Sequence, residues 1–395
     1  MRRDFYSQLG AELGALKKNG TYKYFKYNTN ALNGKINVEQ FGDEIVLCSN
    51  NYLGLANNPE VIEAAHRALD KYGAGASSVR FICGTYDIHR VLEEKVAAFL
   101  GMQAAVTYTS CWAANTACIP ALLSDGDAVI SDELNHASII DGCRAVAKGV
   151  TKAVYRHAGM ASLEEKLKET SGCGAVLVVT DGVFSMEGDI AKLPDIIALC
   201  GKYKALVMID DSHATGVIGK TGRGTMEYYN IKEGVDIISG TFGKALGGAG
   251  GGFIAASRSI CEMLTQRSRP HLFSNSLPPV LCAIAGAAID HLDRNPQIAA
   301  SLAKKTAYMR GKIKAMGLHP IEGDSAIIPI LIGDTAKAIS ISEQMMKEGV
   351  FTIGFGFPVV PEGTARIRLQ ISDALSQEEL DRSLAVIQKA FSSAL

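Results

Sequence analysis

The sequence predicts an α/β fold in which a mainly parallel sheet is covered by helices on both faces, with a smaller α+β domain after it. From about residue 46 to residue 290, short apolar runs rich in β-branched residues alternate with segments of helix length. The runs are continuous and do not alternate with polar residues, which is typical of strands buried on both faces. After about residue 291 the pattern changes to helix, strand, helix, strand and helix, which indicates a second core.

Three segments are therefore expected. Residues 1–45 form an N-terminal amphipathic helix and a polar arm that is rich in tyrosine at 22–27. Residues 46–290 form the large domain and residues 291–395 the small one. No repeat, low-complexity linker or charge block separates them, so we expect the parts to pack closely.

The strands follow one another at spacings that leave room for helices between them. In the large domain they are expected at 104–109, 127–131, 175–182, 205–211, 236–242 and 252–257. In the small domain they are expected at 327–332 and 365–372. A helix over 162–170 is expected to start at Ser162, because Ser-x-x-Glu is a capping pattern.

The composition narrows the possible functions. The 395 residues carry 40 lysines and arginines against 41 acidic residues, so no basic surface for nucleic acid is predicted. The nine cysteines are scattered and lack CxxC spacing, which favours reduced thiols over disulfides or a zinc site. No apolar stretch is as long as a membrane span, and the N-terminus lacks the apolar region of a signal peptide. We expect a soluble, cytoplasmic protein with no metal, membrane or nucleic-acid partner.

The glycine-rich segment SGTFGKALGGAGGG (239–252) places a lysine just after a predicted strand. Ligands of open α/β sheets bind at the carboxyl ends of strands, and glycines let the backbone approach them closely. Lys244 can form a Schiff base there, and Thr241 offers a hydroxyl to a phosphate. The segment lacks the GxxxxGK[ST] pattern, which disfavours a nucleotide P-loop. A structural glycine bend is the plainer alternative.

A second strand end, VMIDDSHATG (207–216), carries Asp210 and His213. A buried carboxylate beside a pyridine nitrogen keeps that nitrogen protonated, which makes the ring an electron sink. An Asp–His metal pair would need further ligands, and neither HExxH nor a cysteine cluster supplies them. Together with Lys244, this pair predicts pyridoxal 5′-phosphate (PLP) as the cofactor.

Two further strand ends contribute to the predicted pocket. In TYTSCWAANT (107–116), free N–H groups at a helix start form an anion site with Ser110 that suits a phosphate. In SDELNHASIIDG (131–142), His136 follows a strand and can stack on a flat cofactor ring. A lone histidine is more often structural, so this role depends on the other residues of the pocket.

These motifs together resemble the α-oxoamine synthase family of fold-type I PLP enzymes, over nearly the whole chain. The matching segments are SNNYLGL (49–55), SVRFICGT (78–85), SCWAAN (110–115), NHASIIDG (135–142), DGVFSMEGD (181–189), DDSHATG (210–216), GTFGKALGG (240–248), RSRPHLFSNSLPP (267–279) and ARIRLQ (365–370). The resemblance implies a seven-stranded, mainly parallel sheet in the large domain.

The resemblance also implies roles for single residues. Lys244 would carry the cofactor, Asp210 would contact its pyridine nitrogen, and His136 would stack on its ring. These three are the predicted catalytic residues. The further cofactor contacts are Ser185 and His213 near the phenolic oxygen, and Ser110, Cys111, Trp112 and Thr241 at the phosphate. Trp112 departs from the family pattern, in which phenylalanine or another smaller residue is expected.

Substrate and partner residues follow from the same resemblance. Asn50 and Ser185 would approach the substrate, and Arg368 would bind its carboxylate. Arg366 lies on the same face of the strand, but Arg368 alone is predicted for this role. Phe273 and Ser274 would reach the phosphate from a neighbouring subunit, which implies a homodimer with shared active sites.

Within the family, SVRFICGT and SRPHLFSNSLPP favour enzymes that condense glycine with acetyl-coenzyme A, reversibly, to 2-amino-3-oxobutanoate, a step of threonine degradation. Lys244 would remove the α-proton as general base while Arg368 holds the carboxylate. The main alternative joins alanine to a pimeloyl thioester with loss of carbon dioxide, giving 8-amino-7-oxononanoate for biotin synthesis. A threonine aldolase would need no coenzyme A, and a non-catalytic PLP carrier would need no carboxylate clamp.

Overall fold

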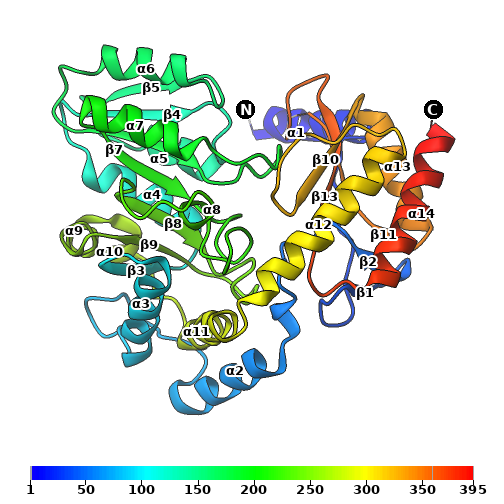
Figure 1. Ribbon diagram of the computed structural model, residues 1–395, viewed down its shortest axis with the longest axis horizontal. Coiled ribbons are helices and arrows are strands. Elements are labelled where there is room, and N and C mark those ends of the chain that lie inside the picture. Colours follow the sequence, from blue (N-terminus) through cyan, green and yellow to red (C-terminus); the bar gives the residue numbers. More distant parts are fainter. Residues whose placement is uncertain (1, 358, 395) are drawn as a thin grey trace.

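The computed structural model describes residues 2–357 and 359–394; residues 1 and 395, the outer ends of the predicted first and last segments, lie outside the described residues. Figure 1 shows a larger part built around one sheet and a smaller part beside it, with the long helix α12 (Gln297–Ala315) running between them. The exact domain boundaries given above stay a prediction.

The large sheet has the strand order β3-β9-β8-β7-β6-β4-β5. Strand β9 pairs antiparallel with β3 and β8, whereas all pairs from β8 to β5 are parallel. The strands are β3 (Ala104–Tyr108), β4 (Ala128–Asp132), β5 (Thr151–Tyr155), β6 (Val176–Asp181), β7 (Leu206–Asp210), β8 (Ile237–Thr241) and β9 (Gly252–Ala256). The predicted mainly parallel, seven-stranded sheet is confirmed.

Strand β5 is the one member of this sheet that the sequence pattern does not reveal. It lies at the edge of the sheet, and only its last residue, Tyr155, is buried. An edge strand with exposed side chains lacks the continuous apolar run by which the other strands are recognised.

Helices cover both faces of the sheet. Neighbouring residues of the central strands enter different cores: Val178 and Ile209 belong to one, Val179 and Met208 to the other. The helices of the larger part are α2 (Pro59–Tyr72), α3 (Asp87–Leu100), α4 (Cys111–Leu122), α5 (Ala137–Arg144), α6 (Met160–Glu169), α7 (Leu193–Tyr203), α8 (Thr225–Tyr228), α9 (Arg258–Arg267), α10 (Arg269–Phe273) and α11 (Pro279–Arg294), with a short 3₁₀ turn at Leu55–Asn57.

The predicted start of helix α6 is wrong by two residues. The helix begins at Met160, and its N-cap is Gly159. The hydroxyl of Ser162 instead accepts a hydrogen bond from the backbone N–H of Arg156 (3.2 Å), so it holds the preceding loop.

The smaller part contains an antiparallel sheet in the order β10-β13-β12, which confirms the predicted α+β character. Strands β10 (Ile327–Gly333) and β13 (Ala365–Gln370) match the two predicted strands, and β12 (Gly354–Phe355) is a short addition. Helix α14 (Gln377–Ala394) packs here against both α12 and α13 (Thr335–Lys347).

The N-terminal segment also contributes to the smaller part, which the sequence pattern does not predict. After helix α1 (Arg2–Lys18), strand β1 (Lys35–Val38) pairs with β2 (Gly42–Val46), and β2 pairs in parallel with β11 (Val350–Phe351). These strands are too short to give a recognisable apolar run. None of the described helices has the length and apolarity to cross a membrane.

Candidate active site

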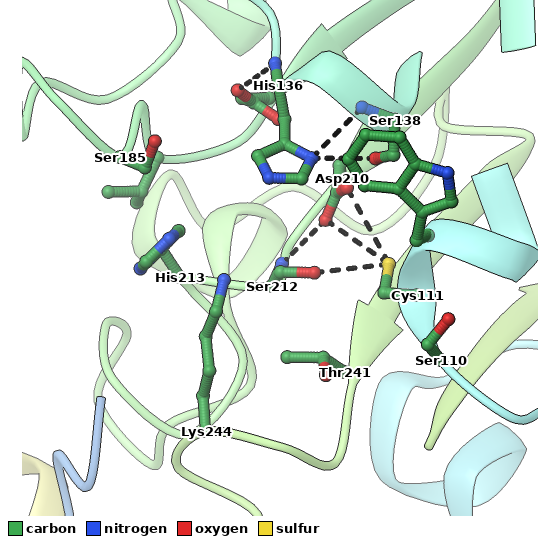
Figure 2. Close-up of a pocket in the computed structure, with 13 residues that line it drawn as sticks. Ser110, Cys111, His136, Ser138, Ser185, Asp210, Ser212, His213, Thr241 and Lys244 are labelled. Carbon is green, nitrogen blue, oxygen red and sulfur yellow. Dashed lines mark hydrogen bonds between the residues drawn. The ribbon is translucent and has the colours of Figure 1, made fainter. Parts of the chain in front are cut away.

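A cavity of about 200 Å³ lies at the carboxyl ends of β4, β6, β7 and β8, where the sequence predicts the ligand site. Figure 2 shows side chains from these strand ends and from the start of α4 turned toward one space. The predicted residues that line it are Ser110, Cys111, Trp112, His136, Ser185, Asp210, His213, Thr241 and Lys244. Ser138, Asp181, Val183 and Ser212 line it as well.

Asp210 is the last residue of β7 and is only 4% exposed. Its Oδ2 accepts a hydrogen bond from Asn115 Nδ2 (2.6 Å), and its Oδ1 accepts one from the backbone N–H of Ser212 (2.9 Å). Each oxygen thus has a fixed donor, which sets the orientation of the carboxylate within the cavity wall.

His136 is the N-cap of α5, and its ring is exposed in the cavity. The Oγ of Ser138 accepts a hydrogen bond from Asn115 Nδ2 (2.9 Å) and lies 2.7 Å from His136 Nδ1. The Ser138 hydroxyl hydrogen therefore points to Nδ1, which also accepts from the backbone N–H of Ser138 (3.3 Å). The ring is held at the cavity wall with Nδ1 as acceptor, an orientation that suits stacking on a cofactor.

Lys244 follows β8, and Figure 2 shows its side chain extending into the cavity toward His213 and Ser212. Burial lowers the pKa of its ammonium group, although the negative charge of Asp210 opposes that shift. A lowered pKa increases the share of neutral amine, which is the form that attacks a carbonyl carbon or accepts a proton.

The start of α4 provides an anion site at the other end of the cavity. Ser110 caps the helix by accepting a hydrogen bond from the N–H of Ala113 (3.1 Å), and the first N–H groups of a helix have no partner within it. Gly252 lets β9 pass close by, since a Cβ there would lie 2.3 Å from the backbone nitrogen of Cys111. With Thr241 in the lining, this end suits a phosphate.

Arg368 contacts Ser185 of the cavity lining, but neither Arg368 nor Asn50 is itself among the lining residues. Nη1 of Arg368 donates to the carbonyl oxygen of Ser185 (2.8 Å), and its Nε is buried without a partner within the described part of the chain. A carboxylate ligand would satisfy this orphaned donor. Arg366, in contrast, is 4% exposed and forms an ion pair with Glu187 (2.9 Å), so it is not available to a substrate.

The residues present fit PLP. An amine for its aldehyde, a buried carboxylate for its ring nitrogen and a capped helix start for its phosphate surround one cavity. A model of the family described as aminotransferase class I and II matches residues 42–387. The chain belongs to this family.

Relatives within this aminotransferase family cover almost the whole chain. A protein named 2-amino-3-ketobutyrate coenzyme A ligase from Salmonella typhimurium is 47% identical over 389 residues, which are 97% of this chain and 96% of the relative. An 8-amino-7-oxononanoate synthase 1 from Bacillus velezensis is 43% identical and covers 97% of both chains. The structure of a serine palmitoyltransferase from S. paucimobilis with a bound PLP–myriocin aldimine has a TM-score of 0.92 at 29% identity, with 99% and 98% coverage. The predicted resemblance to the α-oxoamine synthases is thus confirmed.

Two further predicted residues, Phe273 and Ser274, do not line the cavity. Phe273 is 70% exposed, and Ser274 next to it is exposed as well. Neither lines the cavity of its own chain. Their assignment to the site of a neighbouring subunit stays a prediction.

Several residues of the site are not among those predicted. Asp181 ends β6, and its Oδ2 accepts a hydrogen bond from the backbone N–H of His136 (2.9 Å). Burial, followed by the negative charge of Asp210, raises the pKa of Asp181 well above its usual value. The position of Asp181 at the end of a predicted strand could have identified it as a site residue. Asn115 and Ser138 are small polar residues inside helices, and nothing in their sequence context marks them.

His157 fixes the turn that carries Ser185. Its Nδ1 contacts Asp132 Oδ1 (3.1 Å) and its Nε2 contacts Asp189 Oδ2 (3.0 Å), while the carbonyl oxygen of Asp189 accepts from the N–H of Phe184 (3.0 Å). Burial by itself lowers the pKa of His157, but the hydrogen bonds to both carboxylates outweigh it and raise the pKa to about 10. The imidazolium is therefore the resting form at neutral pH.

Replacing His157 with asparagine is expected to destabilise the fold by about 3 kcal/mol at pH 6, because Asp132 is left buried without a cation. The folded-state pKa lies above the unfolded value, so this stabilisation is complete below pH 6.5 and is lost as the pH rises through about 10. Urea unfolding of both proteins from pH 6 to pH 10.5 measures the difference. A difference that stays constant over this range would contradict the assignment.

Trp112 is the single tryptophan of the chain and forms part of the cavity wall. Its ring meets His136 edge to face, with centroids 5.8 Å apart. Addition of PLP to the apoprotein is expected to quench the tryptophan emission, because PLP absorbs where the indole emits. Trp112→Phe should keep turnover within about threefold, since the helix N–H groups and not the indole bind the phosphate. Unchanged emission in protein that has taken up PLP would contradict this placement.

Proposed function

We propose that the chain is a PLP-dependent acyltransferase that condenses glycine with acetyl-coenzyme A to give 2-amino-3-oxobutanoate and coenzyme A. The observation that carries the proposal is the convergence of Lys244, Asp210 and the capped start of α4 on one cavity, with an orphaned Arg368 donor at its edge. The 2-amino-3-ketobutyrate coenzyme A ligase that is 47% identical over nearly the full length supports the choice of substrates.

The residues of the chain divide the work as follows. Lys244, Asp210, His136 and the start of α4 would hold PLP, which supplies an electron sink for the bond broken at the α-carbon of glycine. Arg368 would bind the glycine carboxylate and so orient the substrate. Neutral Lys244 Nζ would accept the α-proton, and Asp210 would hold a proton at the pyridine nitrogen of the cofactor.

A homodimer with shared sites is part of the proposal. Phe273 and Ser274 are exposed and lie outside the cavity of their own chain, which supports a role in a second subunit. All nine cysteines are free, which supports a reducing compartment such as the cytoplasm.

An 8-amino-7-oxononanoate synthase activity is the second candidate, because the Bacillus velezensis relative is 43% identical over the same span. The two activities differ in the amino acid and the thioester but share the residues described above. Acyl-chain choice amounts to about 1–3 kcal/mol per methylene in a pocket, so it depends on walls that these shared residues do not form.

Release of free thiol from acyl-coenzyme A by the PLP-loaded protein tests the proposal. Thiol is expected from acetyl-coenzyme A only when glycine is present, together with 2-amino-3-oxobutanoate. Release only with alanine and a pimeloyl thioester would replace this proposal with the second candidate. Cleavage of threonine that needs no coenzyme A would replace both with an aldolase.

A further inference from the structure

A series of hydrogen bonds, partly buried at Arg368 and buried beyond it, connects Arg368 with His213 at the cavity. Arg368 Nη2 donates to Gln370 Oε1 (3.1 Å), Gln370 Nε2 contacts the Tyr52 hydroxyl (2.7 Å), and that hydroxyl contacts His213 Nδ1 (2.8 Å). Gln370 is 1% exposed and Tyr52 is fully buried. Tyr52 follows β2, whereas Gln370 ends β13, so these hydrogen bonds connect segments that lie far apart in the sequence.

The chemistry of the groups fixes the direction of every bond in this series. A guanidinium only donates, so the oxygen of the Gln370 amide must face Arg368 and its NH₂ must face away. The NH₂ group then donates to Asn50 Oδ1 (2.7 Å) and to the oxygen of Tyr52. Because the Tyr52 oxygen accepts from Gln370, its own hydrogen is left to donate to His213 Nδ1.

The direction of the last bond sets the protonation pattern of His213. Burial, with the positive charges of Lys244 and Arg368 next in size, holds the pKa of His213 well below its usual value, so the ring is neutral. A neutral ring that accepts at Nδ1 carries its proton on Nε2. Among the described residues Nε2 has no hydrogen-bond partner, and His213 lines the cavity beside Lys244 (Figure 2).

We propose that Gln370 and Tyr52 are positioning residues that fix His213 as a hydrogen-bond donor toward the cofactor and that tie this state to the Arg368 carboxylate clamp. The acceptor would be the phenolic oxygen of PLP, so this part of the inference rests on the proposed function. The tautomer of His213 is set by the residues of the protein and does not depend on PLP.

The substitution Gln370→Glu reverses the direction of the hydrogen bond to Tyr52 with a side chain of nearly the same shape. A carboxylate at this position still accepts from Arg368, but it has no hydrogen to donate and accepts the hydrogen of Tyr52 instead. His213 Nδ1 then loses its donor. Tyr52→Phe removes the same donor directly and leaves Gln370 and Arg368 in place. Both variants therefore remove the hydrogen-bond donor to His213 Nδ1, but only Gln370→Glu changes the contact with Arg368.

¹⁵N-histidine NMR of the apoprotein measures the tautomer without cofactor. His213 is assigned among the eight histidines by its loss in His213→Gln. In the native protein its Nδ1 is expected at the shift of an unprotonated nitrogen, and both variants are expected to move toward a mixture of tautomers. Signals of His213 that are the same in all three proteins would overturn the proposal.

Two readouts on the PLP-loaded protein test the coupling. Both variants should shift the visible absorption maximum of the bound cofactor in the same direction, and the double variant should shift it no further than either one alone. Only Gln370→Glu should change the KM for glycine, upward by about tenfold, because the added carboxylate competes for Arg368. Ser383→Ala, which removes a buried hydroxyl of α14 remote from the cavity, is the matched control for stability.

The outcomes separate this inference from the proposed function. A moved tautomer signal and a shifted band, in protein that releases no thiol from glycine and acetyl-coenzyme A, would support the positioning role of Gln370 and Tyr52 and reject the proposed reaction. Normal thiol release by the native protein, with absorption spectra and His213 signals of both variants that overlay those of the native protein, would support the proposed reaction and reject the positioning role of Gln370 and Tyr52. An unchanged KM for glycine in Gln370→Glu would overturn the tie to Arg368.

Discussion

Lys244→Ala is expected to lower kcat for thiol release by about 10⁴-fold, since the variant loses both the amine that binds the cofactor covalently and the general base. Lys244 Nζ is the amine that lines the cavity near Asp210, and burial lowers its pKa toward the reactive neutral form. Steady-state kinetics with glycine and acetyl-coenzyme A measure this loss.

The same variant should still bind PLP, because the start of α4 and Asp210 are unchanged. Its visible absorption band is expected to match that of free PLP, and the band should disappear on dialysis. Lys220→Ala, an exposed lysine beyond the cavity lining, is the control and should keep both band and turnover. Retention of turnover in Lys244→Ala would exclude Lys244 as the base and the cofactor-binding amine.

The fold was predictable where burial leaves a strong pattern. Six strands of the large sheet are covered on both faces and appear as continuous apolar runs, whereas the exposed edge strand β5 does not. The pairing of β2 with β11 joins residues about 300 positions apart, and strands this short have too few side chains for the sequence to predict which strand they pair with. Long-range pairing of that kind depends on the assembled core rather than on local sequence.

The candidate site was predictable to the extent that its residues follow strands. Lys244, Asp210 and His136 lie after β8, at the end of β7 and after β4, and parallel strands bring these ends to one edge of the sheet. The residues that orient them are different. Asn115 and Gln370 orient their neighbours through the hydrogen bonds of their side-chain amides. These bonds depend on positions that only the folded structure provides.

Asp210→Asn is expected to lower kcat/KM for glycine by about 10³-fold while leaving the fold intact. The amide oxygen can accept from only one of the two donors, Asn115 Nδ2 and the Ser212 N–H, so the new NH₂ group meets the other donor or turns into the cavity. A pyridine nitrogen facing a donor instead of a carboxylate does not keep its proton, and the ring loses its capacity as an electron sink.

Asp211→Asn provides the matched control, because it makes the same chemical change one residue away. Asp211 is 1% exposed, accepts hydrogen bonds from the backbone and hydroxyl of Thr225, and does not line the cavity. Its loss should lower thermal stability but change kcat/KM by no more than about threefold, since its hydrogen bonds stabilise the loop and not the reacting atoms. Equal losses of activity in the two variants would show that Asp210 acts through folding and not through the ring nitrogen.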